Sequence, residues 1–250
     1  MTAPSLSGVD VAVLAGGLGT RIREVLGDVP KVLAPVGGRP FLDHLLDWLR
    51  GQGARRVVLC LGHLAERVEA HLAHSPPDGI EVVTVVEPRP LGTAGALRFA
   101  RPHLRSDPVL AMNGDTFLEA DLPSFLAGHL AARADVSLLC VEVPSVARYG
   151  SVELDARGRV ARFVEKDPAA ERPGLVSGGV YLLSAAALDR LAAGAGPSLE
   201  RDFLEAQPPG TIRAQAVRGR FVDIGTPPSL RAAEHIVPGA SAPTRAGSPS

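Results

Sequence analysis

Short apolar runs alternate with amphipathic segments along the first half of the chain. The runs are rich in Val and Leu and are five to eight residues long, which is typical of buried β-strands. They are Val9–Leu14, Arg56–Leu61, Ile80–Val85, Pro108–Met112 and Val136–Val143. Between them, apolar residues recur at helical spacing, which predicts helices over 40–51, 65–73, 93–103 and 121–134. Such an alternation favours a mostly parallel sheet with helices on both faces.

The alternation changes after Val143. The sequence Asp155-Ala-Arg-Gly158 is typical of a hairpin turn, and it separates two predicted strands at 151–154 and 159–165. Further strands are expected at 177–183 and 221–224, and further helices at 185–193, 199–206 and 228–236. We therefore predict an α/β fold of one domain, with a Rossmann-like three-layer α/β/α arrangement around a mixed central sheet.

The two ends of the chain differ from its body. Residues 1–8 form an N-terminal lead, and residues 237–250 are rich in Pro, Gly, Ser and Ala, which predicts a disordered tail. Residues 9–236 carry the strand and helix patterns without an internal linker, so they are expected to form a single domain. The N-terminus lacks a charged segment followed by an apolar one, and no run reaches the roughly 18 apolar residues of a membrane span, so export and membrane insertion are not expected.

Composition narrows the class of ligand. The 250 residues are 46% hydrophobic and contain 26 basic against 27 acidic residues, a balance that argues against nucleic acid or membrane surfaces as partners. Small molecules are the expected ligands, and self-association is left open. Cys60 and Cys140 each lie in an apolar run, which indicates buried thiols and a reducing, cytoplasmic setting.

The basic residues are unevenly divided between the two cationic types. The chain has 24 Arg but only two Lys, Lys31 and Lys166, and a single Asn, Asn113. In a chain that uses Arg so freely, the positions that keep Lys are candidates for a specific chemical role.

A glycine-rich loop follows the first predicted strand, at the strand end where open α/β sheets bind ligands. It runs Leu14-Ala-Gly-Gly-Leu-Gly-Thr-Arg21 and fits neither a dinucleotide fingerprint nor a P-loop, because Ile22 replaces the third glycine and no Gly-Lys-Ser/Thr follows. Its bare N–H groups and Arg21 suit phosphate oxygens, although a tight β-to-α turn would also need glycines.

Charged residues in three other segments are candidates for the same site. Lys31 lies in an ordered loop rich in Pro and Gly, where its ammonium suits a phosphate. Asp115 ends an apolar strand, and Asp223 alternates with apolar neighbours, so the two carboxylates could share a Mg²⁺ ion. Taken singly, these residues also fit a surface lysine and turn or cap aspartates, and Glu165 with Lys166 fits a surface ion pair.

Taken together, the motifs make the chain resemble the sugar-1-phosphate nucleotidyltransferases over about residues 9–236. In chain order they are residues 14–21, Pro30-Lys31, Leu91-Gly-Thr-Ala-Gly95, Asn113-Gly-Asp115, Glu165-Lys166, Ser177-Gly-Gly-Val-Tyr181 and Val222-Asp-Ile-Gly225. Residues 29–42 and 149–155 look like the D-glycero-D-manno-heptose 1-phosphate guanylyltransferases, with mannose-1-phosphate guanylyltransferases close behind. The resemblance implies a nucleotide-diphospho-sugar transferase fold of the GT-A type.

The resemblance also implies a reaction and the parts that residues play in it. A sugar 1-phosphate would attack the α-phosphorus of a nucleoside triphosphate, with GTP expected, and release pyrophosphate. Arg21 would hold the pyrophosphate, Lys31 the α-phosphate, Lys166 the sugar phosphate, and Asp115 with Asp223 a Mg²⁺ ion. Nucleotide-binding residues would be Leu14, Ala15, Gly16, Gly17, Gly19, Thr20, Glu87, Gly92, Thr93, Asn113 and Gly114; sugar-binding residues would be Tyr149, Gly150, Glu165, Gly178 and Gly179.

The chain departs from the family pattern at two positions, and rival functions stay open. Val32 replaces the second proline of the usual Pro-Lys-Pro, and Ser177 stands where members often have Asn. The sequence is expected to contain the catalytic domain without a C-terminal β-helix. Mannose 1-phosphate, or UTP, ATP or dTTP as donor, are the alternatives, followed by a non-catalytic nucleotide-sugar-binding subunit and a dinucleotide-dependent oxidoreductase.

Overall fold

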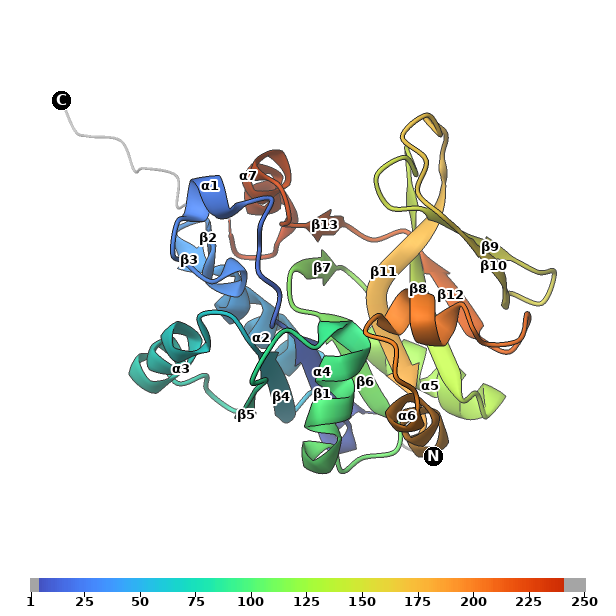
Figure 1. Cartoon of the computed structure of the whole chain (residues 1–250), viewed down its shortest axis with the longest axis horizontal. Helices are drawn as coiled ribbons and strands as arrows, with labels where there is room; N and C mark the ends of the chain where they lie inside the picture. Colours follow the sequence, from blue (N-terminus) through green and yellow to red (C-terminus); the bar gives the residue numbers. More distant parts are fainter. Residues whose placement is uncertain (1–4, 241–250) are drawn as a thin grey trace.

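The structure is a computed structural model that describes residues 5–240 (Figure 1). The strands of this part are β1 (Asp10–Leu14), β2 (Pro35–Val36), β3 (Arg39–Pro40), β4 (Arg56–Leu61), β5 (Glu81–Val86), β6 (Val109–Asn113), β7 (Thr116–Leu118), β8 (Val136–Val143), β9 (Ser151–Leu154), β10 (Val160–Val164), β11 (Gly174–Leu183), β12 (Arg213–Val217) and β13 (Phe221–Asp223). The α-helices are α1 (Arg23–Leu26), α2 (Phe41–Gly51), α3 (Ala65–His74), α4 (Gly92–Ala100), α5 (Leu122–Ala132), α6 (Ala185–Ala193) and α7 (Pro227–Ile236). Short 3₁₀ turns are η1 (Leu6–Gly8), η2 (Lys31–Leu33) and η3 (Arg101–His103), and η4 (Leu199–Leu204) is a short π-type turn.

A seven-stranded sheet forms the centre of the molecule, in the order β12-β8-β11-β6-β1-β4-β5. All of its strands run parallel except β11, which pairs antiparallel with both β6 and β8. Separate two-stranded ladders join β9 to β10, β7 to β13 and β2 to β3. The predicted α/β fold with a mixed central sheet is confirmed.

Alternation along the strands divides the core between the two faces of the sheet. Val11 and Val13 pack into one apolar cluster with α2 and α5, whereas Ala12 packs into the other with α4 and α6. The same period of two appears in β4, where Val57 and Val58 belong to opposite clusters. Because both faces are covered by helices, the strands are apolar on both sides, which is why they read as continuous apolar runs.

Most predicted elements are present with small shifts at their ends. β4, β8, β9 and α6 have the predicted bounds, and Asp121 caps α5 by accepting a hydrogen bond from the Ser124 N–H at 2.9 Å. The predicted helix over 93–103 is α4 followed by the 3₁₀ turn η3, because Pro102 cannot donate the hydrogen bond that would continue the helix. The predicted helix over 199–206 is the shorter η4, a wider π-type turn.

Several short elements are not evident from the sequence pattern. β12 lies at the edge of the main sheet, and its Arg-Ala-Gln-Ala-Val sequence carries too little apolar bulk to stand out. β7 is three residues long and is paired with β13 rather than with a neighbour in sequence. Pairings of this kind depend on long-range contacts, so local periodicity does not report them.

The folded part extends beyond the predicted domain at both ends. Leu6 in the predicted lead is fully buried in the core, as are Val237 and Ala240 in the predicted tail. The carbonyl group of Ala240 lies where a side chain on Gly37 would be, so residues 237–240 pack tightly rather than belonging to a disordered tail. The rest of that predicted tail, residues 241–250, lies outside the described residues. Within residues 5–240, no helix combines the length and the apolar character that crossing a membrane requires.

Candidate active site

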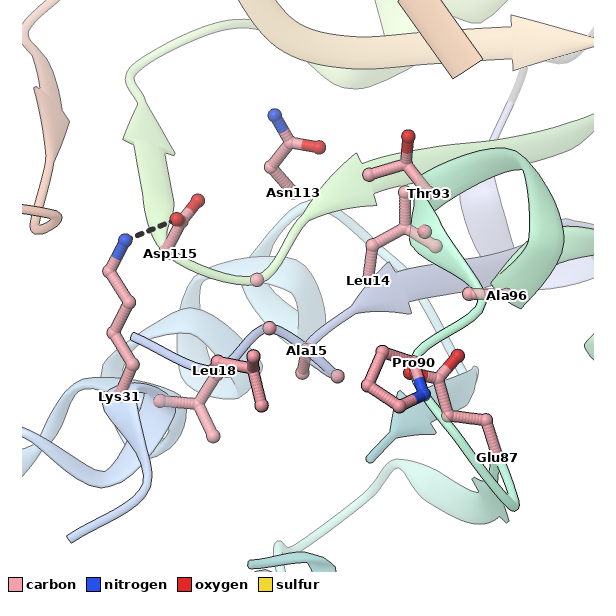
Figure 2. Close-up of a pocket in the computed structure, with 15 residues that line it drawn as sticks. Leu14, Ala15, Leu18, Lys31, Glu87, Pro90, Thr93, Ala96, Asn113 and Asp115 are labelled. Carbon is pink, nitrogen blue, oxygen red and sulfur yellow. Dashed lines mark hydrogen bonds and ion pairs between the residues drawn. The ribbon is translucent and has the colours of Figure 1, made fainter. Parts of the chain in front are cut away.

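A cavity of about 290 Å³ opens at the carboxyl ends of β1 and β6, beside the start of α4 (Figure 2). We call it the glycine-loop cavity. It is lined by Leu14, Ala15, Gly16, Gly17, Leu18, Lys31, Val32, Glu87, Pro90, Gly92, Thr93, Ala96, Asn113, Gly114 and Asp115. Its position follows from the fold, because the carboxyl ends of parallel strands meet at one edge and the loops that leave them frame a crevice.

Glycines let the backbone come close to the walls of this cavity. A Cβ atom on Gly16 would lie 3.0 Å from Glu87 Oε1, and one on Gly114 would lie 2.9 Å from the Leu14 carbonyl oxygen. Gly92 has a φ of 74°, and a side chain there would overlap Pro197. By contrast, nothing lies within 4 Å of a Cβ position on Gly17. That glycine faces open space, where the backbone is free to approach a ligand.

Glu87 is an unusual carboxylate for a cavity wall. Its Oε2 atom is buried and has no hydrogen-bond partner in the described part of the chain. Burial raises the pKa of Glu87, and a backbone hydrogen bond from Leu91 only partly offsets this. A buried acceptor without a partner is costly unless a ligand supplies the donor.

A charged cluster lies at one end of the same cavity. Lys31 Nζ contacts Asp115 Oδ2 (Figure 2) and lies 3.5 Å from Asp223 Oδ1. The β7–β13 ladder causes this meeting, since it pairs Asp223 with Thr116, the residue after Asp115. Gly225 leaves room beside the cluster: a Cβ atom there would lie 3.0 Å from Lys31 Nζ and 3.3 Å from Arg21 Nη2.

The two carboxylates of this cluster fit a hard divalent cation. No group of three or more candidate metal ligands occurs within residues 5–240, so a cage made of protein ligands alone is not present there. Mg²⁺ typically takes one or two carboxylates together with substrate phosphates and water, and Asp115 and Asp223 provide that number of carboxylates.

A second cavity, of about 410 Å³, lies beside the β9–β10 hairpin, and we call it the hairpin cavity. It is lined by Tyr149, Gly150, Ser151, Val152, Phe163, Val164, Glu165, Lys166, Ser177, Ser198, Glu200, Arg201 and Glu205. Gly150 has a φ of 75°, and a side chain there would meet the Val164 carbonyl oxygen at 2.7 Å, so this turn requires glycine.

A buried tyrosine fixes one wall of the hairpin cavity. The hydroxyl group of Tyr181 donates to Glu200 Oε1 at 2.6 Å and lies 3.1 Å from Ser177 Oγ. Burial, reinforced by the charge of Glu200, raises the pKa of Tyr181 well above its ordinary value. Burial and the nearby charges of Glu165 and Glu200 likewise raise the pKa of Glu205. The wall therefore presents carboxylates that suit hydroxyl donors.

The structure gathers most of the residues singled out from the sequence. Eleven of them line the glycine-loop cavity, namely Leu14, Ala15, Gly16, Gly17, Lys31, Glu87, Gly92, Thr93, Asn113, Gly114 and Asp115. Tyr149, Gly150, Glu165 and Lys166 line the hairpin cavity, and Arg21 and Asp223 lie beside Lys31 at Gly225.

A few of the predicted residues lie elsewhere. Gly19 lies beneath Lys31, with its Cβ position 3.6 Å from the Lys31 Cβ, and Thr20 is exposed on the turn before α1. Gly178 does not face the hairpin cavity, because it is buried against Leu118 and Leu139. Gly179 lies against the Asn113 amide, so it supports the glycine-loop cavity instead.

Several residues in or beside the two cavities gave no signal in the sequence. Gly62 lies at the end of β4, and a Cβ atom there would come 2.8 Å from Glu87 Oε1. Glu200, Arg201 and Glu205 lie on or next to η4 and enter the hairpin cavity from there. Ser198 caps η4 by accepting the Arg201 N–H at 3.2 Å, and a cap of this kind indicates where a helical turn begins but not which carboxylates it presents.

Sugar-1-phosphate guanylyltransferases are among the known proteins that this chain resembles. D-glycero-α-D-manno-heptose 1-phosphate guanylyltransferase from Aneurinibacillus thermoaerophilus is 32% identical over 231 residues, covering 90% of this chain and 97% of that protein. Mannose-1-phosphate guanylyltransferase from Mycobacterium tuberculosis is 35% identical over 200 residues, and the chain spans 55% of its length. The crystal structure of HddC from Yersinia pseudotuberculosis superimposes with a TM-score of 0.81 at 34% identity, over 90% of this chain and 97% of HddC, and HddC has also been solved complexed with GMP-PN.

A family model completes the comparison. The model described as "Nucleotidyl transferase" matches residues 11–238, which include both cavities and the charged cluster between β7 and β13. Members of this family generally use a divalent metal ion, in keeping with the pair of aspartates beside Lys31. The chain therefore belongs to the nucleotidyl transferase family.

Proposed function

We propose that this enzyme transfers the guanylyl group of GTP to D-glycero-D-manno-heptose 1-phosphate. An oxygen of the sugar phosphate attacks the α-phosphorus, the bond from that phosphorus to the oxygen bridging to the β-phosphorus breaks, and pyrophosphate leaves. Such a transfer needs no covalent intermediate with the protein, so positioning and charge neutralisation carry the catalysis.

The meeting of Lys31 with Asp115 and Asp223 is the observation that carries the proposal. Lys31 is held at the end of the glycine-loop cavity, and Arg21 approaches the same point across Gly225. Two cations at this place suit the charge that develops on the α-phosphate and on the departing pyrophosphate. We assign Lys31 to the α-phosphate and Arg21 to the pyrophosphate, while the free N–H groups around Gly17 bind further phosphate oxygens.

The metal in this proposal is Mg²⁺, held by Asp115 and Asp223. When bound, it would neutralise charge on the phosphate oxygens and orient them for in-line transfer. Lys31 would then move from the carboxylates toward the phosphates, because its flexible stem carries three rotatable donors.

Glu87 supports guanine as the base. The Watson–Crick edge of guanine presents two neighbouring N–H donors, at N1 and at the exocyclic N2, and a carboxylate can accept both. The carboxylate of Glu87, which lines the cavity, suits such a pair. Uracil and thymine present one N–H flanked by two carbonyl oxygens, and those oxygens would be repelled by the carboxylate. This argument favours GTP over UTP and dTTP.

The hairpin cavity supports a sugar with many hydroxyl groups. Glu165, Glu200 and Glu205 provide carboxylate acceptors around Lys166, which we assign to the phosphate of the sugar. The heptose-specific relative matches over nearly its full length, whereas the mannose-specific relative is matched over about half, and this favours the heptose. Mannose 1-phosphate is the second candidate, because that relative has the higher identity.

A cytoplasmic location accompanies the proposal. Cys60 and Cys140 are free, buried thiols, and burial raises the pKa of each to about 12. Thiols of this kind suit a reducing compartment, and nucleoside triphosphates are available there.

A substrate panel tests the proposal. The purified protein is incubated with Mg²⁺, one of four nucleoside triphosphates and either heptose 1-phosphate or mannose 1-phosphate, and both pyrophosphate and product mass are measured. We expect GDP-heptose to form with the highest kcat/KM. GDP-mannose as the best product would replace the sugar assignment, and absence of pyrophosphate with every pair would refute the proposed reaction.

A further inference from the structure

We infer that a second anion-binding site lies at the opposite edge of the sheet, and that it takes a compact, multiply charged phosphate compound. The site is a cavity of about 700 Å³, which we call the arginine cavity. It is lined by Ala132, Arg133, Ala134, Asp135, Val136, Arg157, Arg159, Arg190, Gln207, Pro208, Thr211 and Arg213. Val136 begins β8 and Arg213 begins β12, so the cavity lies at the amino ends of these strands, away from the two cavities described above.

Charge is strongly unbalanced in the arginine cavity. Five arginines line it, against Asp135 in the lining and Asp155 in the adjoining turn. Arg190 pairs with Asp135 at 3.0 Å. In the described part of the chain, no carboxylate forms an ion pair with the other four arginines, Arg133, Arg157, Arg159 and Arg213. Asp155 instead accepts hydrogen bonds from the backbone N–H groups of Arg157 and Arg159.

Two of these arginines are placed directly opposite each other by the backbone. Arg159 and Arg213 form an isolated antiparallel bridge, which puts their side chains on the same face. Like charges in directly opposed positions destabilise a pair of strands, and a bound anion removes that cost. The arrangement is thus better suited to the bound state than to the empty one.

The arginines are also held in defined positions. Arg159 Nη1 donates to the Gly210 carbonyl oxygen at 2.9 Å, and Arg213 Nη1 donates to Gln215 Oε1 at 3.4 Å. The guanidinium group of Arg213 lies over Gly128 in α5, where a Cβ atom would come within 2.8 Å of its Cζ. A glycine in the middle of a helix is unfavourable, and here it makes room for this guanidinium group.

The chemistry of the lining selects the class of ligand. Guanidinium groups form paired hydrogen bonds with phosphate oxygens, and five of them around one cavity suit several phosphates at once. The lining contains no aromatic side chain on which a nucleobase could stack. We therefore assign the site to a compact polyphosphate rather than to a nucleotide or a nucleic acid.

The β9–β10 hairpin connects this site with the hairpin cavity. Its turn carries Arg157 and Arg159, and its other end carries Gly150, Glu165 and Lys166. The two ends are about 15 Å apart, given roughly 3.3 Å per strand residue. An anion that orders the turn therefore acts on the segment that presents Lys166, a consequence that rests on the proposed function.

Direct binding measurements test the site without requiring turnover. Inositol hexakisphosphate, a compact polyanion, is titrated by calorimetry into the wild type and into Arg159→Gln/Arg213→Gln. The control Arg67→Gln/Arg231→Gln removes two exposed arginines that line none of the three cavities. We expect the Kd to rise at least tenfold in the first variant and less than twofold in the control. Equal loss of probe binding in both variants would overturn the proposal, because it would show that the probe responds only to overall charge. Loss of probe binding in Arg21→Gln but not in Arg159→Gln/Arg213→Gln would also overturn it, because the probe would then occupy the catalytic site.

Two further readouts accompany the titration, and the first of them depends neither on the variants nor on the reaction. Hydrogen exchange on the wild type should show protection of residues 156–160 and 212–214 by the probe; protection confined to residues 15–21 would overturn the site. If the proposed reaction is established, the probe should change the KM for the sugar 1-phosphate at least twofold in the wild type and not in Arg159→Gln/Arg213→Gln. Binding without that change refutes the connection through the hairpin while the site itself stands.

Discussion

The two cavities at the carboxyl edge of the sheet are built in different ways. The glycine-loop cavity is formed largely by backbone and glycines from segments that follow parallel strands, with Lys31, Glu87 and Asp115 as its charged groups. The hairpin cavity is formed by side chains from the β9–β10 hairpin, β11 and η4, three segments that are separated in sequence. A backbone-built site binds what all triphosphates share, whereas a site built from side chains can change its ligand by changing a few residues.

The largest expected effect is at the charged cluster at the end of the glycine-loop cavity. Lys31→Gln removes the cation from between Asp115 and Asp223, so kcat should fall about 10³-fold, in the range found for loss of a group that stabilises developing charge. GTP binding, measured by calorimetry, should weaken much less, because the loop N–H groups remain. Arg67→Gln is the matched control for the lost charge, and a kcat within threefold of the wild type in Lys31→Gln would remove Lys31 from the reaction.

Lys166→Arg tests the hairpin cavity by itself. The substitution keeps the charge but replaces a compact ammonium with a planar fork, so kcat should fall about 10²-fold while the Kd for GTP stays within twofold. Single-turnover kinetics and nucleotide titration separate the two effects. If GTP binding falls together with turnover, the two cavities do not have separate roles; if turnover is unchanged, Lys166 is not part of the site.

Glu87→Gln tests base choice in the glycine-loop cavity. An amide can accept one of the two guanine N–H groups but not both, so KM for GTP should rise roughly 10- to 100-fold, which corresponds to about 1.5–3 kcal/mol for a hydrogen bond to a charged group. The melting temperature of the free protein should not fall, because a neutral amide costs less to bury without a partner than a carboxylate does. A KM for GTP equal to that of the wild type would exclude Glu87 from guanine recognition.

The pH dependence of GTP binding follows from the same residue. Burial raises the pKa of Glu87, and only the ionised carboxylate accepts both guanine donors. As the solution is acidified, KM for GTP should therefore begin to rise at a higher pH than it would if Glu87 had the pKa of an ordinary glutamate. Glu87→Gln should lack this rise, and a wild-type KM that stays flat down to the usual pKa of glutamate would contradict the assignment.

The smallest effect is expected at Gly17. Because nothing lies within 4 Å of its Cβ position, Gly17→Ala should leave the melting temperature unchanged and raise KM for GTP a few-fold through contact with the triphosphate. Gly92→Ala is the contrasting variant, since its side chain would overlap Pro197 at a φ of 74°, and it should lower the melting temperature measurably. Equal stability losses in the two variants would show that both glycines are structural.

The glycine-loop cavity was largely predictable because its residues lie in short continuous motifs. The loop 14–21, Thr93 and Asp115 each follow a strand or begin a helix that the apolar pattern identifies, and parallel strands bring their carboxyl ends to one edge. Glu200 and Glu205 of the hairpin cavity were not predictable, because η4 reaches that cavity only through contacts such as the hydrogen bond from the Leu199 N–H to Thr93 Oγ1 at 2.8 Å. The position of Gly178 was not predictable even though it lies in a recognised motif. Which neighbours it faces depends on the irregular pairing of β11 with β8.

The sequence by itself determined the fold class, the order of the main elements and the family, because alternating apolar runs and local glycine motifs encode them directly. The two lysines and the lone asparagine stood out by composition alone, and all three line the two cavities. Only the tertiary structure decided that Asp223 meets Lys31, that Glu87 keeps an acceptor without a partner, and that Arg159 faces Arg213. These features arise where strands distant in sequence pair or where burial removes water, and neither is written in the local pattern of the chain.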